Sequence, residues 1–288
     1  MAVRSGVLAS LGGRLGRALG AGAPRFATDD VRVGRGVSFG RDVVFTSRRV
    51  RIGDGVVIQD GVRVEAEDFE IGDYGTIYPG CFFPGPGALR IGHNFWMGRG
   101  AVVDAMGGTT IGDNVCVGVG AQLWTHMQFG DVLYGCRFHH VRPVAVGDDA
   151  WLGSGVLVAP VNVGPRSLAL AGAVVTRPML ADRSYAGVPA ADVTDKVGPP
   201  FAVRPVEERA AMLEKRLDEF ALANGGPAVR ARLHVVPDAG SVARPTPADI
   251  VFDVEARTYT KRGTALEAAV LRFLLPDAKF TPRVDASA

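Results

Sequence analysis

The sequence contains little cysteine, and the cysteines it has are not arranged for cross-linking or metal binding. Cys81, Cys116 and Cys136 are odd in number, and no two of them have C-x-x-C spacing. Neither a disulfide framework nor a zinc site is therefore predicted, and no metal is expected. Unpaired cysteines are typical of a reducing compartment, so we expect a cytoplasmic protein.

Long uncharged hydrophobic runs are also missing. Near the N-terminus, Arg14 and Arg17 interrupt the apolar residues, so no uncharged stretch has the length of a signal peptide. Residues 1–30 are predicted to form a tail or an amphipathic capping helix. No segment approaches transmembrane length, and no membrane span is expected.

The chain has almost no net charge. Its 32 basic and 30 acidic residues give a formal charge of +2, and only four of the basic residues are lysine. No basic stripe interleaved with aromatic residues is present, so a nucleic-acid partner is not expected. We expect a small molecule as the partner instead.

Glycine, in contrast, is abundant, and its positions are periodic. The sequence has 38 glycines, and a large apolar residue recurs about every six positions from Ile52 to Val175. A glycine directly follows nine of these apolar residues: Gly53, Gly72, Gly92, Gly98, Gly112, Gly118, Gly147, Gly153 and Gly164. We expect these glycines to allow a corner with positive φ.

This period predicts a solenoid of short strands, because it fits neither the helical nor the alternating strand period. Three hexads make one triangular coil of about eighteen residues, and the coils stack at a strand separation of about 4.8 Å. We assign residues 31–200 to this β-helix, with a first coil at Val33, Phe39 and Phe45. The regular spacing breaks once, where residues 125–141 form a long excursion of the kind that usually serves binding.

The chain changes character after the solenoid. Residues 201–226 are predicted to be a helical linker, with a helix over 205–222. Its apolar face is predicted to consist of Met212, Leu213, Leu217 and Phe220. Residues 227–288 are predicted to form a small α/β appendage.

The appendage is predicted to contain two strands and one helix. The strands are expected at about 232–236 and 250–259, and the helix at 264–274. Thr264 and Glu267 have the spacing of a capping box at the start of that helix.

Three segments of the sequence carry a resemblance to a known family. They are Val146-Gly-Asp-Asp-Ala-Trp-Leu-Gly153, Ala171-Gly-Ala-Val-Val-Thr-Arg177 and Ala186-Gly-Val-Pro-Ala190. Together they resemble the hexapeptide-repeat acyltransferases, which include maltose, galactoside and xenobiotic O-acetyltransferases. The resemblance covers about residues 33–197. It implies a left-handed parallel β-helix, a homotrimer with sites between subunits, and acetyl-CoA or another acyl-CoA as co-substrate.

The same resemblance implies the catalytic residues. In the family, one histidine precedes a loop that a Pro-Val-x-Ile-Gly-Asp-type hexad closes; here His126 precedes the excursion and 143–148 closes it. His126 is therefore the expected general base, a role that suits an imidazole near neutral pH. Ser154 matches a serine near the thioester oxygen, where a donor would stabilise the developing oxyanion.

Other matching positions are expected to bind the co-substrate or the acceptor. The positions that match the coenzyme groove are Trp151, Gly153, Ala171, Gly172, Thr176 and Arg177. The candidates for acceptor contact are Trp124, Asp104 and Met97. Galactoside-type enzymes tend to carry Asn at the position of Met97 and Asp at that of Ala105, so a galactoside acceptor is in doubt. A different sugar or a small amine stays open.

Two other functions compete with acyl transfer. A γ-carbonic anhydrase shares the solenoid, but it needs three histidines, two of them five positions apart, and His126, His139 and His140 lack that spacing. The other alternative is a non-catalytic scaffold whose appendage recognises partners. Against it stands the combination of His126, the excursion and Ser154.

Overall fold

The computed structural model describes residues 23–238 and 246–283, and the chain divides into two compact units between Phe201 and Ala202. The predicted N-terminal helix falls mostly on residues 1–22, outside this range. No helix in the described ranges is long and apolar enough to cross a membrane.

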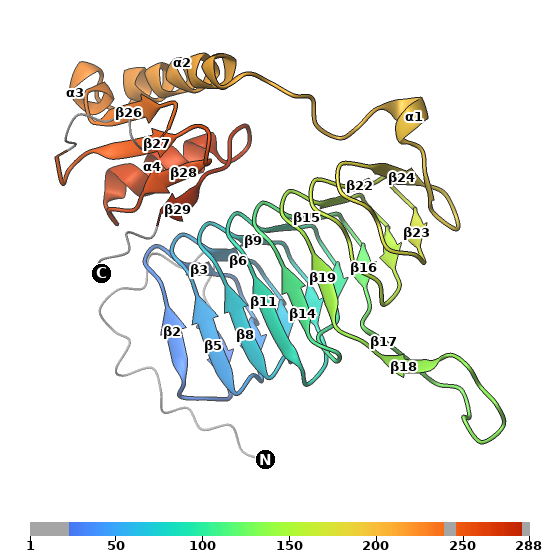
Figure 1. Cartoon of the computed structure of the whole chain (residues 1–288). Coiled ribbons are helices and arrows are strands. Elements are labelled where there is room, and N and C mark those ends of the chain that lie inside the picture. Colours follow the sequence, from blue (N-terminus) through green and yellow to red (C-terminus); the bar gives the residue numbers. More distant parts are fainter. Residues whose placement is uncertain (1–22, 239–245, 284–288) are drawn as a thin grey trace. The chain divides into compact units, whose positions relative to one another are not determined.

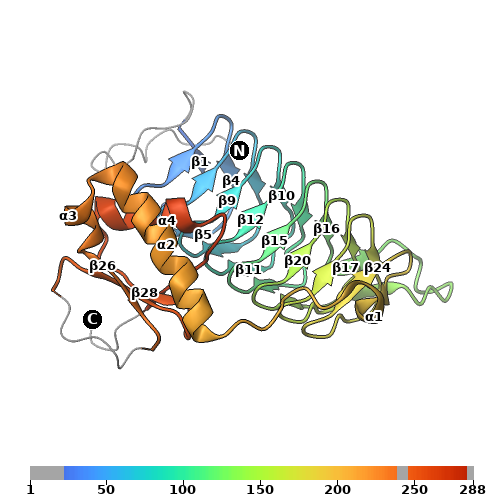
Figure 2. The same cartoon turned by 90° about the horizontal axis from the view of Figure 1, so that it is seen from above.

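The first unit is a three-sided parallel β-helix, which confirms the predicted fold class (Figures 1 and 2). Sheet 1 consists of β1 (Arg25–Phe26), β4 (Val44–Phe45), β7 (Arg63–Val64), β10 (Phe82–Phe83), β13 (Val102–Val103), β16 (Gln122–Leu123), β21 (Leu157–Val158) and β23 (Val174–Val175). Sheet 2 consists of β2 (Val31–Val33), β5 (Arg49–Ile52), β8 (Asp68–Ile71), β11 (Ala88–Ile91), β14 (Thr109–Ile111) and β19 (Val144–Val146). Sheet 3 consists of β3 (Ser38–Phe39), β6 (Val57–Ile58), β9 (Thr76–Ile77), β12 (Trp96–Met97), β15 (Cys116–Val117), β20 (Trp151–Leu152), β22 (Leu168–Ala169), β24 (Ser184–Ala186) and β25 (Ala191–Asp192).

The chain visits the sheets in the order 1, 2, 3, so each coil has three corners: the 1–2, the 2–3 and the 3–1 corner. All strand pairs of these sheets are parallel except β24 with β25. The first coil predicted at Val33, Phe39 and Phe45 is present, and β1 extends the stack one strand further.

The recurring apolar residues point into the solenoid and form its core. Val117, Leu123 and Val158 are at most 1% exposed, and Ala169 is fully buried. At the N-terminal end the core is aromatic, with the rings of Phe45 and Phe69 centred 5.7 Å apart. Burying one such large side chain contributes about 1.5–3 kcal/mol, so the repeat stabilises the fold coil by coil.

The nine glycines that follow the apolar residues do not have positive φ, so that prediction is wrong. Positive φ occurs two residues further on, for example at Gly55, Asn94 and Asn114. The nine glycines instead allow close packing between coils. A Cβ atom on Gly118 would lie 2.5 Å from the carbonyl carbon of Gly153, which leaves no room for a side chain.

The excursion is a two-stranded antiparallel arm that projects from the solenoid (Figure 1). β17 (His126–Gln128) pairs with β18 (His139–Val141), with His126 opposite Val141. At the base of the arm, the amide of Arg142 donates a hydrogen bond of 2.8 Å to the carbonyl oxygen of Thr125. The solenoid therefore closes beneath the arm, and β19 continues it.

The short helix α1 (Thr194–Val197) ends the first unit. The second unit contains helices α2 (Val206–Asn224), α3 (Pro227–Arg230) and α4 (Ala265–Leu274). Its sheet contains β26 (Leu233–Val236), β27 (Ile250–Asp253), β28 (Thr258–Thr260) and β29 (Thr281–Arg283). In α2, Leu213, Leu217 and Phe220 are buried as predicted, whereas Met212 is 52% exposed and does not belong to the packed face.

The strand and the capping box predicted for the second unit have different outcomes in the structure. The single strand predicted at 250–259 is wrong: a turn separates β27 from β28, because the amide of Ala256 binds the Asp253 carboxylate and Arg257 has a φ of 55°. The capping box is present, since the Glu267 amide donates to Oγ1 of Thr264 over 3.1 Å.

Candidate active site

His126 lies at the 1–2 corner, where the chain leaves the solenoid for the arm, and its imidazole contacts a buried carboxylate. Nδ1 of His126 lies 2.7 Å from Oδ2 of Asp104, one coil below. The two residues approach because β13 and β16 pair in parallel, with Val103 beside Leu123. The His126 side chain is 24% exposed and the Asp104 side chain fully buried, so the ring is held from inside and presented to solvent.

Hydrogen bonds from three residues hold the Asp104 carboxylate. Oδ2 accepts from the amide of Thr125 over 2.9 Å and from its hydroxyl, and Oδ1 accepts from the amide of Met106 over 3.1 Å. Burial by itself would raise the pKa of Asp104, but the bonds from Thr125, His126 and Met106 outweigh burial and hold its pKa below the ordinary 3.8. Asp104 is therefore a carboxylate at neutral pH.

An ionised Asp104 fixes the tautomer of His126. A carboxylate only accepts hydrogen bonds, so Nδ1 must carry the hydrogen, and the lone pair is left on Nε2. The arrangement provides an oriented base whose protonated form the buried carboxylate stabilises. It can take a proton from a hydroxyl or amine bound at the surface of the 1–2 corner.

Trp124 lies beside this pair. Its ring is 5.7 Å from the His126 ring in an edge-on arrangement, and its Nε1 donates to Gln122. The arm histidines are not part of the pair: His140 and His139 lie opposite Met127 and Gln128, further out on the arm.

The 3–1 corner carries the second group of predicted residues. The amide of Gly155 binds the carbonyl oxygen of Val119 over 2.9 Å, and the amide of Gly172 binds that of Ser154 over 2.9 Å. Ser154, Ala171 and Gly172 are exposed there, and Gly153 is buried. Positive-φ glycines run along this corner with open space where a side chain would stand: Gly80, Gly100, Gly120, Gly155 and Gly172. This edge therefore has open space beside its backbone, although the amides of these glycines already donate to the neighbouring coil.

One chain does not bring His126 and Ser154 together. Ser154 lies beside Val119, and His126 follows Val119 by seven positions, with strand β16 between them. At about 3.3 Å per residue this corresponds to roughly 20 Å, far beyond contact. The two groups occupy opposite edges of sheet 1.

The remaining residues predicted to bind the coenzyme also lie at two different corners. Thr176 and Arg177 are exposed at the 1–2 corner, two coils beyond Trp124, because Leu123, Val158 and Val175 share one register position. Trp151 lies on sheet 3, next to the 3–1 corner, and is 53% exposed.

Two predicted acceptor contacts are wrong. Met97 is fully buried in the core, and Asp104 is fully buried beneath His126, so neither side chain can contact a bound acceptor. The role of Asp104 in orienting His126 was missed, and so was that of Thr125, whose hydroxyl also accepts from the amide of Gly107. The spacing in the sequence could have indicated the contact between Asp104 and His126, because Asp104 precedes Trp124 by one coil length of twenty residues.

Within residues 23–238 and 246–283, no three His, Cys, Asp or Glu side chains gather to form a metal-binding group.

The chain resembles acetyltransferases over part of its length. Over 105 residues it is 35% identical to the protein named Putative acetyltransferase YJL218W of Saccharomyces cerevisiae. The match covers 35% of this chain and 53% of the yeast protein, so the chain spans about half the length of that relative. No family model matches. The similarity confirms the resemblance to acetyltransferases found in the sequence.

Solved structures of similar proteins include two acetyltransferases. One is the hexapeptide-repeat-containing acetyltransferase VCA0836 of Vibrio cholerae, with 28% identity, a TM-score of 0.33 and coverage of 36% of this chain and 61% of that one. The other is a maltose O-acetyltransferase of Clostridium difficile 630, with 17% identity, a TM-score of 0.27 and coverage of 58% and 66%.

Proposed function

We propose that this protein is an acyl-CoA-dependent acyltransferase that transfers an acetyl group to a hydroxyl or amine of a sugar or sugar-like molecule. The observation that carries the proposal is the pair of His126 and the buried, ionised Asp104. This pair presents a proton-accepting imidazole at the surface, where the arm leaves the solenoid. The arm can help enclose an acceptor there. The similarity to the yeast acetyltransferase supports the same reaction class.

The reaction needs one base and one oxyanion donor. Nε2 of His126 takes the proton from the acceptor hydroxyl or amine as its oxygen or nitrogen attacks the thioester carbonyl. The new bond to carbon forms, and the tetrahedral oxyanion is stabilised by the hydroxyl of Ser154. The carbon–sulfur bond then breaks, and the thiolate of coenzyme A receives the proton from His126. No covalent enzyme intermediate is required.

The site is proposed to form between subunits of a homotrimer. His126 and Ser154 lie on opposite edges of sheet 1, so a second copy must supply one of them. The arm supports this assembly, because several of its apolar side chains lack cover in a single chain: Phe129 is 102%, Leu133 95% and Tyr134 92% exposed. Side chains of this kind usually mark a protein interface.

The coenzyme is proposed to bind between the two edges. The 3–1 corner has open space at the exposed Gly172, beside Ala171 and the buried Gly153, and Trp151 provides an exposed ring nearby. Thr176 and Arg177 of a 1–2 corner would contact its phosphates, for which a guanidinium is a suitable partner. The resemblance adds a left-handed coil and, through the acyl-CoA donor, a cytoplasmic location.

A thiol-release assay tests the reaction. The purified full chain is mixed with acetyl-CoA and a panel of sugars, nucleotide sugars and amino acids, and free coenzyme A is followed. His126→Ala should lower turnover at least about 100-fold, the smallest loss expected for a positioned base. The matched control, His234→Ala in the second unit, should keep turnover near the wild-type value. Equal turnover of the His126 variant and the wild type would remove His126 from the mechanism.

A non-catalytic scaffold protein would give a different result in this assay. It would release no thiol with any acceptor and would show no binding of coenzyme A by calorimetry. Binding of coenzyme A with loss of turnover only in the His126 variant supports the enzyme.

A further inference from the structure

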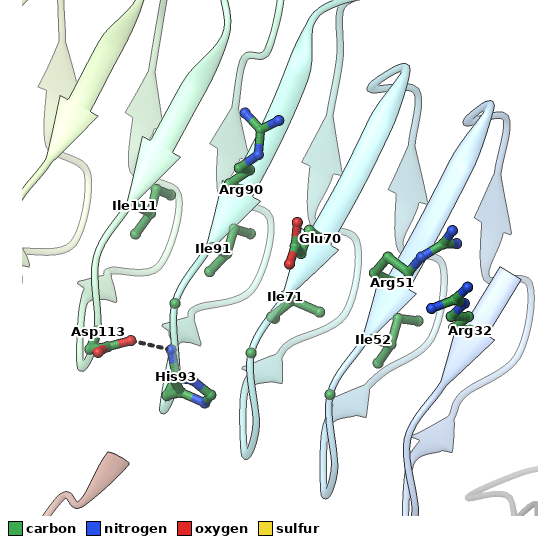
Figure 3. A pocket seen from close by; sticks show the side chains of 13 residues that line it. Arg32, Arg51, Ile52, Glu70, Ile71, Arg90, Ile91, His93, Ile111 and Asp113 are labelled. Carbon is green, nitrogen blue, oxygen red and sulfur yellow. Dashed lines mark hydrogen bonds between the residues drawn. The ribbon is translucent and has the colours of Figure 1, made fainter. Parts of the chain in front are cut away.

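A charged groove of about 610 Å³ lies on the outer face of sheet 2, in the coils before the arm (Figure 3). Its polar lining consists of Arg32, Arg51, Glu70, Arg90, His93 and Asp113. The first four come from the consecutive strands β2, β5, β8 and β11. The groove is separate from the proposed active site, because none of its lining residues belongs to the site at His126 or Ser154.

The four charged side chains form a ladder. Arg32 pairs in register with Arg51, Arg51 with Glu70, and Glu70 with Arg90. Neighbouring strands lie about 4.8 Å apart, so the ladder extends roughly 14 Å along the solenoid. A ligand that contacts all four residues must therefore be elongated.

Three of the four ladder residues have no ion-pair partner among the residues that the structure describes. Arg51 is paired, since its guanidinium lies 2.5 Å from Oδ1 of Asp30. Among the described residues, Arg32, Glu70 and Arg90 form no ion pair within 4.0 Å. Arg32 and Arg51 are like charges directly opposite each other on paired strands, an arrangement that destabilises a sheet. An anion bound between them would remove that repulsion.

The composition of the lining selects the class of ligand. Planar guanidinium groups match carboxylate, sulfate or phosphate groups. The carboxylates of Glu70 and Asp113 accept hydrogen bonds and repel a chain that is anionic throughout. The lining contains no Phe, Tyr or Trp on which nucleobases could stack.

We infer that this groove binds an acidic oligosaccharide. The guanidinium groups of Arg32 and Arg90 hold its acidic groups, and Glu70 between them accepts hydrogen bonds from its hydroxyls. An acidic oligosaccharide combines separated anionic groups with hydroxyl donors, which is the combination that an Arg-Arg-Glu-Arg ladder matches. The inference does not depend on the proposed acyl transfer, because it concerns binding alone.

Calorimetry on the full chain tests the inference, with oligogalacturonate as the probe. A neutral maltooligosaccharide of the same length and an oligothymidylate serve as comparison ligands. The Kd for oligogalacturonate should lie at least about 10-fold below that for either comparison ligand, since charge-assisted hydrogen bonds are roughly twice as strong as neutral ones. Tighter binding of oligothymidylate, or no binding of oligogalacturonate at low salt, would overturn the inference.

Three variants locate the site and identify its chemistry. The double variant Arg32→Gln/Arg90→Gln should raise the Kd for oligogalacturonate about 10-fold. Arg63→Gln, an exposed arginine on sheet 1, should leave the Kd unchanged. Equal weakening by the double variant and by Arg63→Gln would show diffuse attraction and refute the site.

Glu70→Gln separates recognition from simple charge attraction. Removing a negative charge tightens any merely electrostatic binding of an anion. It should weaken a saccharide whose hydroxyls donate to Glu70, so we expect the Kd to rise by a few-fold. Tighter binding of oligogalacturonate by this variant would contradict the proposed recognition.

Discussion

Mixed oligomers of two inactive variants should regain activity if the active site is shared between subunits. The variants are His126→Ala and Ser154→Ala, each of which keeps the residue that the other lacks. Each variant alone should retain at most about 1% of wild-type turnover, because a positioned base and an oxyanion donor each supply about 100-fold or more. The two are co-expressed with different affinity tags, and the doubly tagged oligomers are isolated.

The expected recovery follows from the geometry of the coil. His126 lies at the 1–2 corner, and Ser154 lies beside Val119 at the 3–1 corner, roughly 20 Å away along the extended chain. A base must come within about 3 Å of the proton it takes, so the pair cannot serve one site within a chain. In the proposed cyclic trimer, each site would take His126 from one subunit and Ser154 from the next.

Mixing then makes some sites intact. Every doubly tagged trimer contains both variants, so one of its three sites receives both His126 and Ser154, and turnover should recover to about a third of wild type. If each site used residues of a single chain, mixing would give only the mean of the two variants, about 1%. Recovery no greater than that mean would refute the shared site.

Two controls complete the experiment. Mixing His126→Ala with the double variant His126→Ala/Ser154→Ala removes every intact histidine and should restore nothing. Light scattering of the wild type should give the mass of three 30.3 kDa chains. A monomeric wild type with full turnover would also refute the reasoning.

The remaining predictions concern Asp104 and the packing of the coils. Asp104→Asn should lower kcat about 100-fold with little change in KM, because it removes the charge that orients and stabilises the protonated His126; a stopped kinetic assay across acceptor concentrations measures both constants, and a change confined to KM would contradict this role. Because folding lowers the pKa of Asp104 from 3.8, the stability it contributes is present above about pH 4 and is lost as pH falls through the folded pKa. Urea unfolding of wild type and Asp104→Asn should therefore differ most near neutrality and converge below about pH 4, and a constant difference down to pH 2 would show that ionisation of Asp104 is not involved. Gly118→Ala should destabilise the solenoid by about 3 kcal/mol and lower Tm by about 6–12 °C, because the new Cβ would overlap the backbone of the next coil. Gly120→Ala, where φ is +64° and the space is open, should cost only about 1–2 kcal/mol, and calorimetric scans showing the reverse order would refute the account of close packing.

The solenoid was predictable because its period constrains many residues at once. Each large apolar residue from Ile52 to Val175 had to reappear about six positions later, and the structure buries these positions in one core. The role of the glycines was not predictable in the same way. Positive φ and close backbone approach both favour glycine, and only the position of neighbouring coils distinguishes them.

The second unit was predicted less well, because its turn between β27 and β28 has no local signal in the sequence. The residues between β27 and β28 include Glu255 and Arg257 but no Gly, Pro or Asn, so no turn signal interrupts the predicted strand at 250–259. The turn instead depends on the Asp253 side chain, which accepts from the amide of Ala256. In α2, Met212 lies near the apolar face by sequence, but about half of its side chain is exposed in the structure.

The candidate catalytic histidine and its carboxylate partner differ in how far the sequence pointed to them. The family resemblance singled out His126, which stands where the six-residue repeat breaks. Asp104 was assigned to the acceptor, because its contact with His126 depends on the register between two coils rather than on any local motif. That register places Asp104 in the position that Trp124 occupies one coil later.

The position of the base is therefore set by the solenoid more than by the arm. Parallel pairing of β13 with β16 places the Asp104 carboxylate beneath Thr125 and His126, and the Thr125 amide and hydroxyl hold it there. His126 is also the first residue of the arm strand β17 and lies opposite Val141, so the same network anchors the arm where it leaves the solenoid. In the proposed mechanism, proton transfer therefore depends on the coil that holds Asp104, whereas the exposed apolar side chains of the arm are left to contact an acceptor or a neighbouring subunit.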